Sequence, residues 1–206
     1  MNSFETDLKR AIISIPFVVG VALEFFILLT SGYESDLFKV SIPVVSTLPY
    51  STAWLLDHQN SFIKFYVPRS GVKGYIWGKF LACGISGGLV ELIGCFLYTL
   101  TNSEQEINLG LIFVSGALWA VLATTLAAWS DSRYIAYGGS FVAYYILVIL
   151  HDRYFEDLYC LYPYEWIKPQ HTWVFDEQGI VILILGMILV LGFFYYEILR
   201  RCIERV

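Results

Sequence analysis

The sequence predicts an all-α integral membrane protein with six transmembrane helices. Of its 206 residues, 57% are hydrophobic and 15% are charged, whereas soluble domains are about 45–50% apolar and about 25% charged. Apolar segments recur along the whole chain, and Lys and Arg concentrate in alternate connections between them. We therefore expect residues 1–206 to form one transmembrane domain without a soluble catalytic domain.

The first two spans are predicted at Ala11–Ser31 and Leu37–Leu56. A hydrocarbon core of about 30 Å requires roughly 20 apolar residues in a helix. No small-residue cleavage site follows the N-terminal residues, so the first span is expected to be retained. The second span contains Lys39, Pro43 and Pro49. Proline is tolerated where neighbouring groups satisfy the freed carbonyls, so this span is predicted to be kinked.

The remaining four spans are predicted from uninterrupted apolar stretches. They are Tyr75–Leu100, Leu109–Trp129, Tyr134–Leu150 and Ile180–Leu199. Within the first of them, Gly84 and Gly88 form a small-xxx-small pattern that favours close helix packing.

The basic residues predict the orientation of the spans. The segments assigned to the inner side hold Lys9, Arg10, Lys64, Arg69, Lys73, Lys79, Arg133, Arg200, Arg201 and Arg205. Lys79 starts inside the third span and is expected to extend to that face. The outer segments hold Lys39, Arg153 and Lys168. Because positive charge favours the cytoplasmic side, we expect both termini in the cytoplasm. We further expect the protein to lie in the plasma membrane of a prokaryotic cell.

A long outer connection, residues 151–179, is crowded with aromatic side chains. They are Tyr154, Phe155, Tyr159, Tyr162, Tyr164, Trp166, Trp173 and Phe175. Aromatic rings favour the headgroup level of a bilayer. The composition therefore predicts short interfacial or re-entrant helices between spans five and six.

The long inner connection, Asp57–Gly74, contains a short amphipathic segment. Its apolar side chains are Phe62, Phe65 and Tyr66, its polar ones are Asn60, Ser61 and Lys64, and Pro68 ends it. A helix parallel to the membrane with exposed aromatic residues suits docking into a groove of a partner. The alternative is an interfacial helix that holds the bundle at the membrane surface.

The residues of this connection resemble the permease subunits of ABC-2 type exporters. The resemblance lies in Asn60-Ser61, the aromatic run Phe62–Tyr66, Arg69-Ser70 and the entry to the third span, Tyr75-Ile-Trp-Gly-Lys79-Phe80. The span then continues Leu81-Ala-Cys-Gly-Ile-Ser-Gly-Gly-Leu-Val90, also a family-like opening. The sequence departs from the family at the preceding helix end, where Asp57-His58 stands in place of the usual Glu-Arg.

The resemblance implies a transport subunit that is not itself an enzyme. The inner connection would be a coupling helix that docks on separate ATPase subunits, and a second permease chain, identical or related, would complete the pathway. The docking residues so implied are Asn60, Ser61, Phe62, Lys64, Phe65, Tyr66, Arg69, Asp131 and Arg133. The chain has no P-loop sequence, so ATP and Mg²⁺ would bind the partner, and we expect no cofactor, metal or catalytic residue on this chain.

Glu24 and Glu91 are ionisable residues deep inside predicted spans, at similar depth. Such residues usually face a partner or a wet cavity, so they are candidates for lining a substrate pathway. Alternatively, one or both are protonated and bond to a neighbouring helix. Two other functions stay open. One is a membrane-embedded enzyme or maturation factor that acts on lipid or peptide with His58, Glu24 and Glu91 as acid–base groups, and the other is a secondary transporter with Glu24 or Glu91 as its proton site. The expected partners are protein and membrane lipid; no basic stripe favours nucleic acid.

Overall fold

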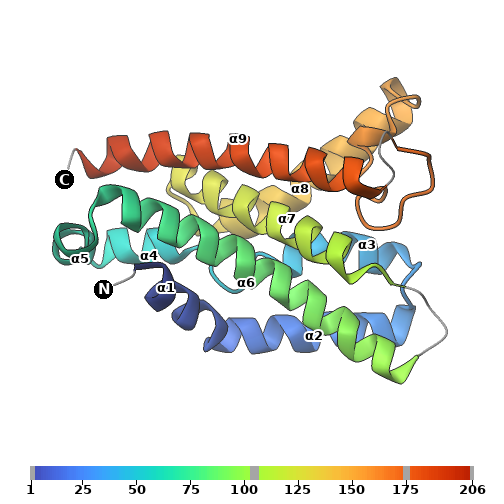
Figure 1. The fold of residues 1–206 in the computed structure, drawn as a ribbon, viewed down its shortest axis with the longest axis horizontal. Helices are drawn as coiled ribbons and strands as arrows, with labels where there is room; N and C mark the ends of the chain where they lie inside the picture. The colour runs from blue at the N-terminus through green and yellow to red at the C-terminus, as the bar shows by residue number, and fades with distance from the viewer. Residues whose placement is uncertain (1–2, 103–106, 174–176, 205–206) are drawn as a thin grey trace.

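A computed structural model describes residues 3–102, 107–173 and 177–204, and this part of the chain is helical without a strand. Its longest helices lie side by side in an elongated bundle (Figure 1). The elements are α1 (Ser3–Ile12), α2 (Ile15–Ser31), α3 (Asp36–Val45), α4 (Ala53–Gln59), α5 (Ile63–Ser70), α6 (Val72–Thr101), α7 (Leu109–Ser130), α8 (Arg133–Tyr154), the 3₁₀ turn η1 (Tyr159–Leu161) and α9 (Glu177–Ile203).

Four helices, α6 to α9, are long and apolar enough to cross a membrane. They coincide with the predicted spans three to six, extended by at most a few residues at each end. Many of their outward side chains are apolar, among them Phe193 and Phe194 of α9, which are 62% and 54% exposed. The structure thus supports a multi-pass membrane protein.

The predicted first span is a pair of helices, because α1 and α2 meet at an angle of 52°. The Ser14 hydroxyl accepts the Phe17 N–H at 3.2 Å, and Pro16 occupies the first turn of α2. Both features favour a new helix start at this point. The sequence prediction missed α1, which begins at Ser3, ahead of the predicted start at Ala11, and packs against α6.

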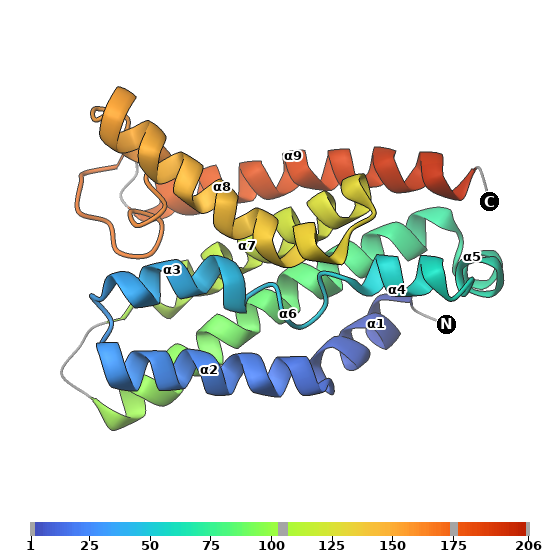
Figure 2. The ribbon, with the colours of Figure 1, turned by 180° about the vertical axis from the view of Figure 1, so that it is seen from behind.

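The predicted second span, residues 37–56, is not one helix. α3 ends at Val45, and residues 46–52 form non-helical turns before α4 begins. Pro49 cannot donate a backbone hydrogen bond, and the hydroxyls of Ser46 and Thr47 bond to the carbonyls of Ile42 (2.6 Å) and Val44 (2.7 Å). α3 and α4 therefore lie towards opposite ends of the bundle, joined by an irregular connection (Figure 2). The predicted kink is a complete interruption.

The two ends of the bundle differ in what they carry. Both chain ends and α5 lie at one end, called here the α5 end (Figure 1). The connection of residues 155–173 lies at the other, called here the loop end. The termini and the 57–74 connection therefore lie at the same end of the bundle, as the sequence predicts.

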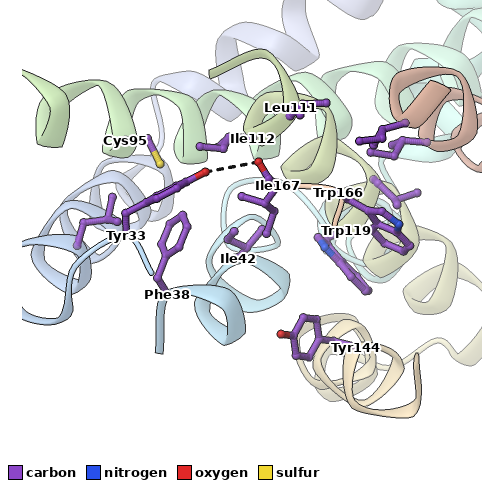
Figure 3. Close-up of a cluster of buried hydrophobic side chains, with 14 of the residues drawn as sticks. Tyr33, Phe38, Ile42, Cys95, Leu111, Ile112, Trp119, Tyr144, Trp166 and Ile167 are labelled. Carbon is purple, nitrogen blue, oxygen red and sulfur yellow. Dashed lines mark hydrogen bonds between the residues drawn. The ribbon is translucent and has the colours of Figure 1, made fainter. Parts of the chain in front are cut away.

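The connection at the loop end folds into the bundle, contrary to the predicted interfacial or re-entrant helices. Its described residues contain only the turn η1; Phe175 lies outside them. Trp166 and Ile167 are each 2% exposed and join a core with Tyr33 and Trp119 (Figure 3). The Trp166 indole N–H donates to the Cys160 carbonyl at 3.0 Å, which satisfies its polar atom and permits burial.

Glu165 holds this inserted loop together. Its carboxylate accepts hydrogen bonds from the backbone N–H groups of Gln170 (3.0 Å) and His171 (3.3 Å) and contacts the His171 ring at 3.0 Å. Burial alone would raise the pKa of Glu165, but these bonds outweigh it and hold the pKa below its ordinary value. The charged carboxylate therefore organises the turn that places Trp166 in the core.

Glycines bring α6 and α7 into close contact, as predicted for Gly84 and Gly88. A Cβ on Gly84 would lie 3.0 Å from the Val121 side chain, and one on Gly88 would lie 2.6 Å from the Phe113 carbonyl oxygen. Only small residues allow such an approach of two backbones.

Candidate functional site

The predicted docking segment forms the tip of the α5 end. Phe62 and Phe65 are 57% and 73% exposed, while Ile63 between them is 3% exposed and packs against the bundle. Asn60, Ser61 and Lys64 are also exposed. Two large aromatic side chains therefore project from a short helix whose other face is fixed to the core.

Tyr66 does not belong to this exposed surface. Its ring packs edge-on against Tyr75 of α6, with centroids 5.6 Å apart. The sequence placed Tyr66 with the docking residues. It follows the buried Ile63 by three positions, however, and residues at this spacing share one face of a helix. The side chain of Arg69 lies outside the described residues.

The second predicted docking segment, residues 130–133, lies beside the first. A guanidinium N–H of Arg133 donates to the side-chain oxygen of Gln59, across 74 positions of sequence. Asp131 adopts a left-handed conformation (φ 52°) and donates its N–H to the Ala127 carbonyl at 2.9 Å, which ends α7. The fold thus connects both predicted docking segments at the α5 end.

A buried ion cluster lies directly behind these segments. Lys79 of α6 is 2% exposed and lies 2.8 Å from Asp57 and 3.6 Å from Asp7. The expectation that Lys79 extends to the membrane surface is wrong, because two acidic partners hold its ammonium group inside the protein. Buried charges require such pairing, since their desolvation is costly.

Hydroxyl groups complete this cluster and connect four parts of the chain. Tyr50 donates to Asp7 at 2.6 Å, and Tyr75 donates to Asp57 at 3.1 Å. α1, the interruption at 46–52, α4 and α6 therefore meet at Lys79. Sequence reasoning missed Asp7, Tyr50 and Tyr75; the available signal was a lysine inside an apolar span, which needs partners.

Glu24 and Glu91 meet in the interior of the bundle. Both are 0% exposed, and their carboxyl groups are close enough to interact directly. Glycines provide the room for them. A Cβ on Gly94 would lie 2.9 Å from Cβ of Glu24, and one on Gly116 would lie 2.6 Å from Cγ of Glu91. The similar depth inferred from sequence is here a direct contact between α2 and α6.

The carboxyl pair also borders the interrupted span. The Ser41 hydroxyl of α3 lies 3.1 Å from Oε1 of Glu24. The backbone N–H of Ser46, at the start of the interruption, faces the carboxyl of Glu91. Lys79 and Glu91 are twelve positions apart on α6, about 18 Å at about 1.5 Å per residue. The interruption thus extends from the carboxyl pair towards the ion cluster.

A separate apolar groove of about 730 Å³ opens between α7, α8 and α9. Trp119 and Trp166 line it together with Ile146, Met187 and Leu191. Neither Glu24 nor Glu91 belongs to its lining. The sequence candidates for a substrate pathway and the groove that could hold an apolar molecule are therefore different places.

Comparisons of the chain with protein-family models, with curated proteins and with solved structures give no match. Within the described ranges, no three His, Cys, Asp or Glu side chains gather as a metal site. His58 stacks on Trp54 at the α5 end, with ring centroids 5.4 Å apart. It is thus next to the ion cluster and not next to Glu24 and Glu91.

Proposed function

We propose that this chain is the permease subunit of an ATP-driven exporter of the ABC-2 type, with six spans and cytoplasmic termini. The observation that carries the proposal is the exposure of Phe62 and Phe65 on a short helix whose opposite face is buried. Exposed aromatic anchors on an amphipathic helix suit a groove on a partner protein. Separate ATPase subunits, binding ATP and Mg²⁺, would provide that groove.

The ion cluster would transmit the movement of the docked segment. Asp57, at the end of α4, is bonded to Lys79 of α6 at 2.8 Å. Arg133, at the start of α8, is bonded to Gln59 of α4. A displacement of α5 by the ATPases would therefore reach two long helices through charged and polar contacts. Interfaces of this kind switch between discrete packings instead of deforming continuously.

The groove between α7, α8 and α9 is the proposed place for the cargo. Its lining is almost wholly apolar, so it suits a hydrophobic or amphipathic molecule such as a small peptide antibiotic, a lipid or a drug. Trp166 of the inserted loop lines the groove at the loop end. A second permease chain, identical or related, would complete the pathway.

The coupling role is tested by the double variant Phe62→Asp, Phe65→Asp. Two carboxylates would be desolvated in the proposed groove, so we expect loss of most ATP-dependent export and roughly tenfold or greater weakening of the association with the ATPase subunit. Export from inside-out vesicles and co-purification in mild detergent measure the two effects.

The matched control is Phe62→Leu, Phe65→Leu, which keeps an apolar surface and should retain both activities. Membrane insertion and unfolding temperature should be the same in both variants, because the two side chains lie outside the core. Export at the wild-type rate by the Asp variant would refute the docking role.

A proton-coupled secondary transporter is the second candidate, and the contact between Glu24 and Glu91 favours it. The purified chain alone, reconstituted in vesicles with an imposed proton gradient, distinguishes the two. Uptake without any ATPase subunit would support the second candidate. The membrane-enzyme alternative loses support, since His58 lies with the ion cluster, about 18 Å along α6 from the carboxyl pair.

A further inference from the structure

The carboxyl groups of Glu24 and Glu91 lie against each other without a protein donor between them. Oε2 of Glu24 and both carboxyl oxygens of Glu91 are buried and receive no hydrogen bond. The Ser46 N–H, which faces Glu91, donates to the Ile42 carbonyl at 3.2 Å. Two acceptor groups in contact require a hydrogen between them, because two buried carboxylates would repel each other.

The surroundings of the two carboxyl groups are unequal. Glu91 is enclosed by α7 at Gly116, and within the described part of the chain Glu24 is its one direct side-chain partner. Glu24 has a second partner, the Ser41 hydroxyl, at 3.1 Å from Oε1. A neutral Glu91 can donate a hydrogen bond to Glu24, and Glu24 can accept hydrogen bonds from both neighbours.

The Ser41 hydroxyl suits either charge state of Glu24. It has one hydrogen and two acceptors in reach, Oε1 of Glu24 at 3.1 Å and the Phe38 carbonyl at 2.7 Å. If the hydrogen points to Glu24, it stabilises a carboxylate. If it points to Phe38, the Ser41 oxygen can accept a hydrogen bond from a neutral Glu24. Rotation of one hydroxyl therefore accommodates both states.

We propose that Glu24 and Glu91 form a proton-binding site, in which Glu91 keeps one proton and Glu24 reversibly binds a second. The site is independent of the exporter assignment. Among the described residues, the titratable groups that interact with the pair are Cys95 of α6 and the two carboxyls themselves. α3 contributes the Ser41 hydroxyl and the Ser46 N–H, and α7 contributes the backbone at Gly116. In the charged state, Glu24 leaves one uncompensated negative charge between α2, α3 and α6.

Loss of the second proton would favour entry of water at residues 46–52, the connection between α3 and α4. Ser46 begins the interruption, and its carbonyl oxygen would lie 2.6 Å from a Cβ on Gly87 of α6. The backbone there lies close to α6, one helical turn before Glu91. A negative charge on Glu24 favours hydration of this place, and water can enter where residues 46–52 lack regular helical hydrogen bonds.

Infrared spectroscopy of the purified chain in lipid nanodiscs tests the proposal, because the C=O stretch of a protonated carboxyl differs from that of a carboxylate. Spectra are compared from about pH 9 to about pH 5, above the range near pH 4 where exposed carboxyls titrate. We expect one protonated carboxyl per chain at the highest pH and a second one as the pH falls. Glu91→Gln should remove the first signal, and Glu24→Gln the second.

The variants are chosen to keep the fold, since Gln has the shape of a protonated Glu and can donate a hydrogen bond. Glu91→Gln should leave the titration of Glu24 nearly unchanged, whereas Ser41→Ala should move its midpoint to higher pH by about one unit. The proposal is overturned if the wild-type chain has no protonated carboxyl at the highest pH. It is also overturned if the Glu24 signal does not change over the range, or if both signals titrate together.

Discussion

Single charged side chains explain how this apolar chain holds its irregular parts in place. Lys79 has two carboxylate partners, and each carboxylate also accepts a hydrogen bond from a tyrosine hydroxyl. The interruption at 46–52 carries one of these tyrosines, Tyr50, so its conformation depends on the cluster. Removal of the lysine would leave the buried Asp7 and the partly buried Asp57 without this cation.

Lys79→Met should therefore lower the free energy of unfolding by roughly 3–5 kcal/mol. Thermal unfolding in detergent provides the measurement. Lys9→Met is the control, because its ion pair with Glu5 is exposed on both sides (67% and 62%) and should contribute little. Equal unfolding temperatures for the two variants would mean that the cluster does not stabilise the fold.

At the scale of elements, Gly87 allows the connection between α3 and α4 to lie against α6. A Cβ on Gly87 would lie 2.4 Å from Cβ of Ala120 in α7 and 2.6 Å from the Ser46 carbonyl. Both neighbours are rigid, one being backbone and the other the first atom of a side chain. Gly87 thus allows α6, α7 and residues 46–52 to meet at one place.

Gly87→Ala should separate these elements and destabilise the protein by roughly 1–3 kcal/mol. Gly138→Ala in α8 is the matched control, since a Cβ there meets nothing within 4 Å. The control should be neutral or stabilising by up to about 1 kcal/mol, because alanine favours a helix over glycine. If Gly87→Ala unfolds at the same temperature as Gly138→Ala, then Ala120 and the Ser46 carbonyl do not pack tightly against Gly87 in solution.

At the scale of the whole molecule, the two ends of the bundle present different chemistry. The α5 end carries both termini and the exposed Phe62 and Phe65 (Figure 1). The loop end is closed by Trp166 and Ile167, and Tyr33 after α2 donates to the Ile167 carbonyl at 3.4 Å (Figure 3). If the bundle spans a membrane as proposed, these ends face opposite compartments.

Two native cysteines test this arrangement without the introduction of new ones. Cys160 lies in the loop at one end and Cys202 near the C-terminus at the other, both partly exposed, while Cys83 and Cys95 are buried. In intact cells, a membrane-impermeant maleimide should label Cys160, and Cys202 should react only after permeabilisation. Cys160→Ser and Cys202→Ser identify each signal. Labelling of both sites from the same side would contradict the proposed topology.

The sequence by itself determined that this is a membrane protein and where its four long helices lie. Hydropathy and the length of an apolar segment depend only on consecutive residues, so both can be read without the tertiary structure. It also identified Glu24, Glu91, Gly84 and Gly88 as residues that need a reason to lie inside an apolar span. Each of these inferences depends on the residue and its local surroundings alone.

Tertiary structure decided which partners those residues have. The interruption at 46–52, the partners of Lys79, the contact of Glu24 with Glu91 and the burial of Trp166 all join segments distant in the sequence. A proline predicts a disturbance, but whether the helix bends or breaks depends on which groups satisfy its freed backbone. A buried charge likewise requires a partner, and only the packing of the helices determines which one it finds.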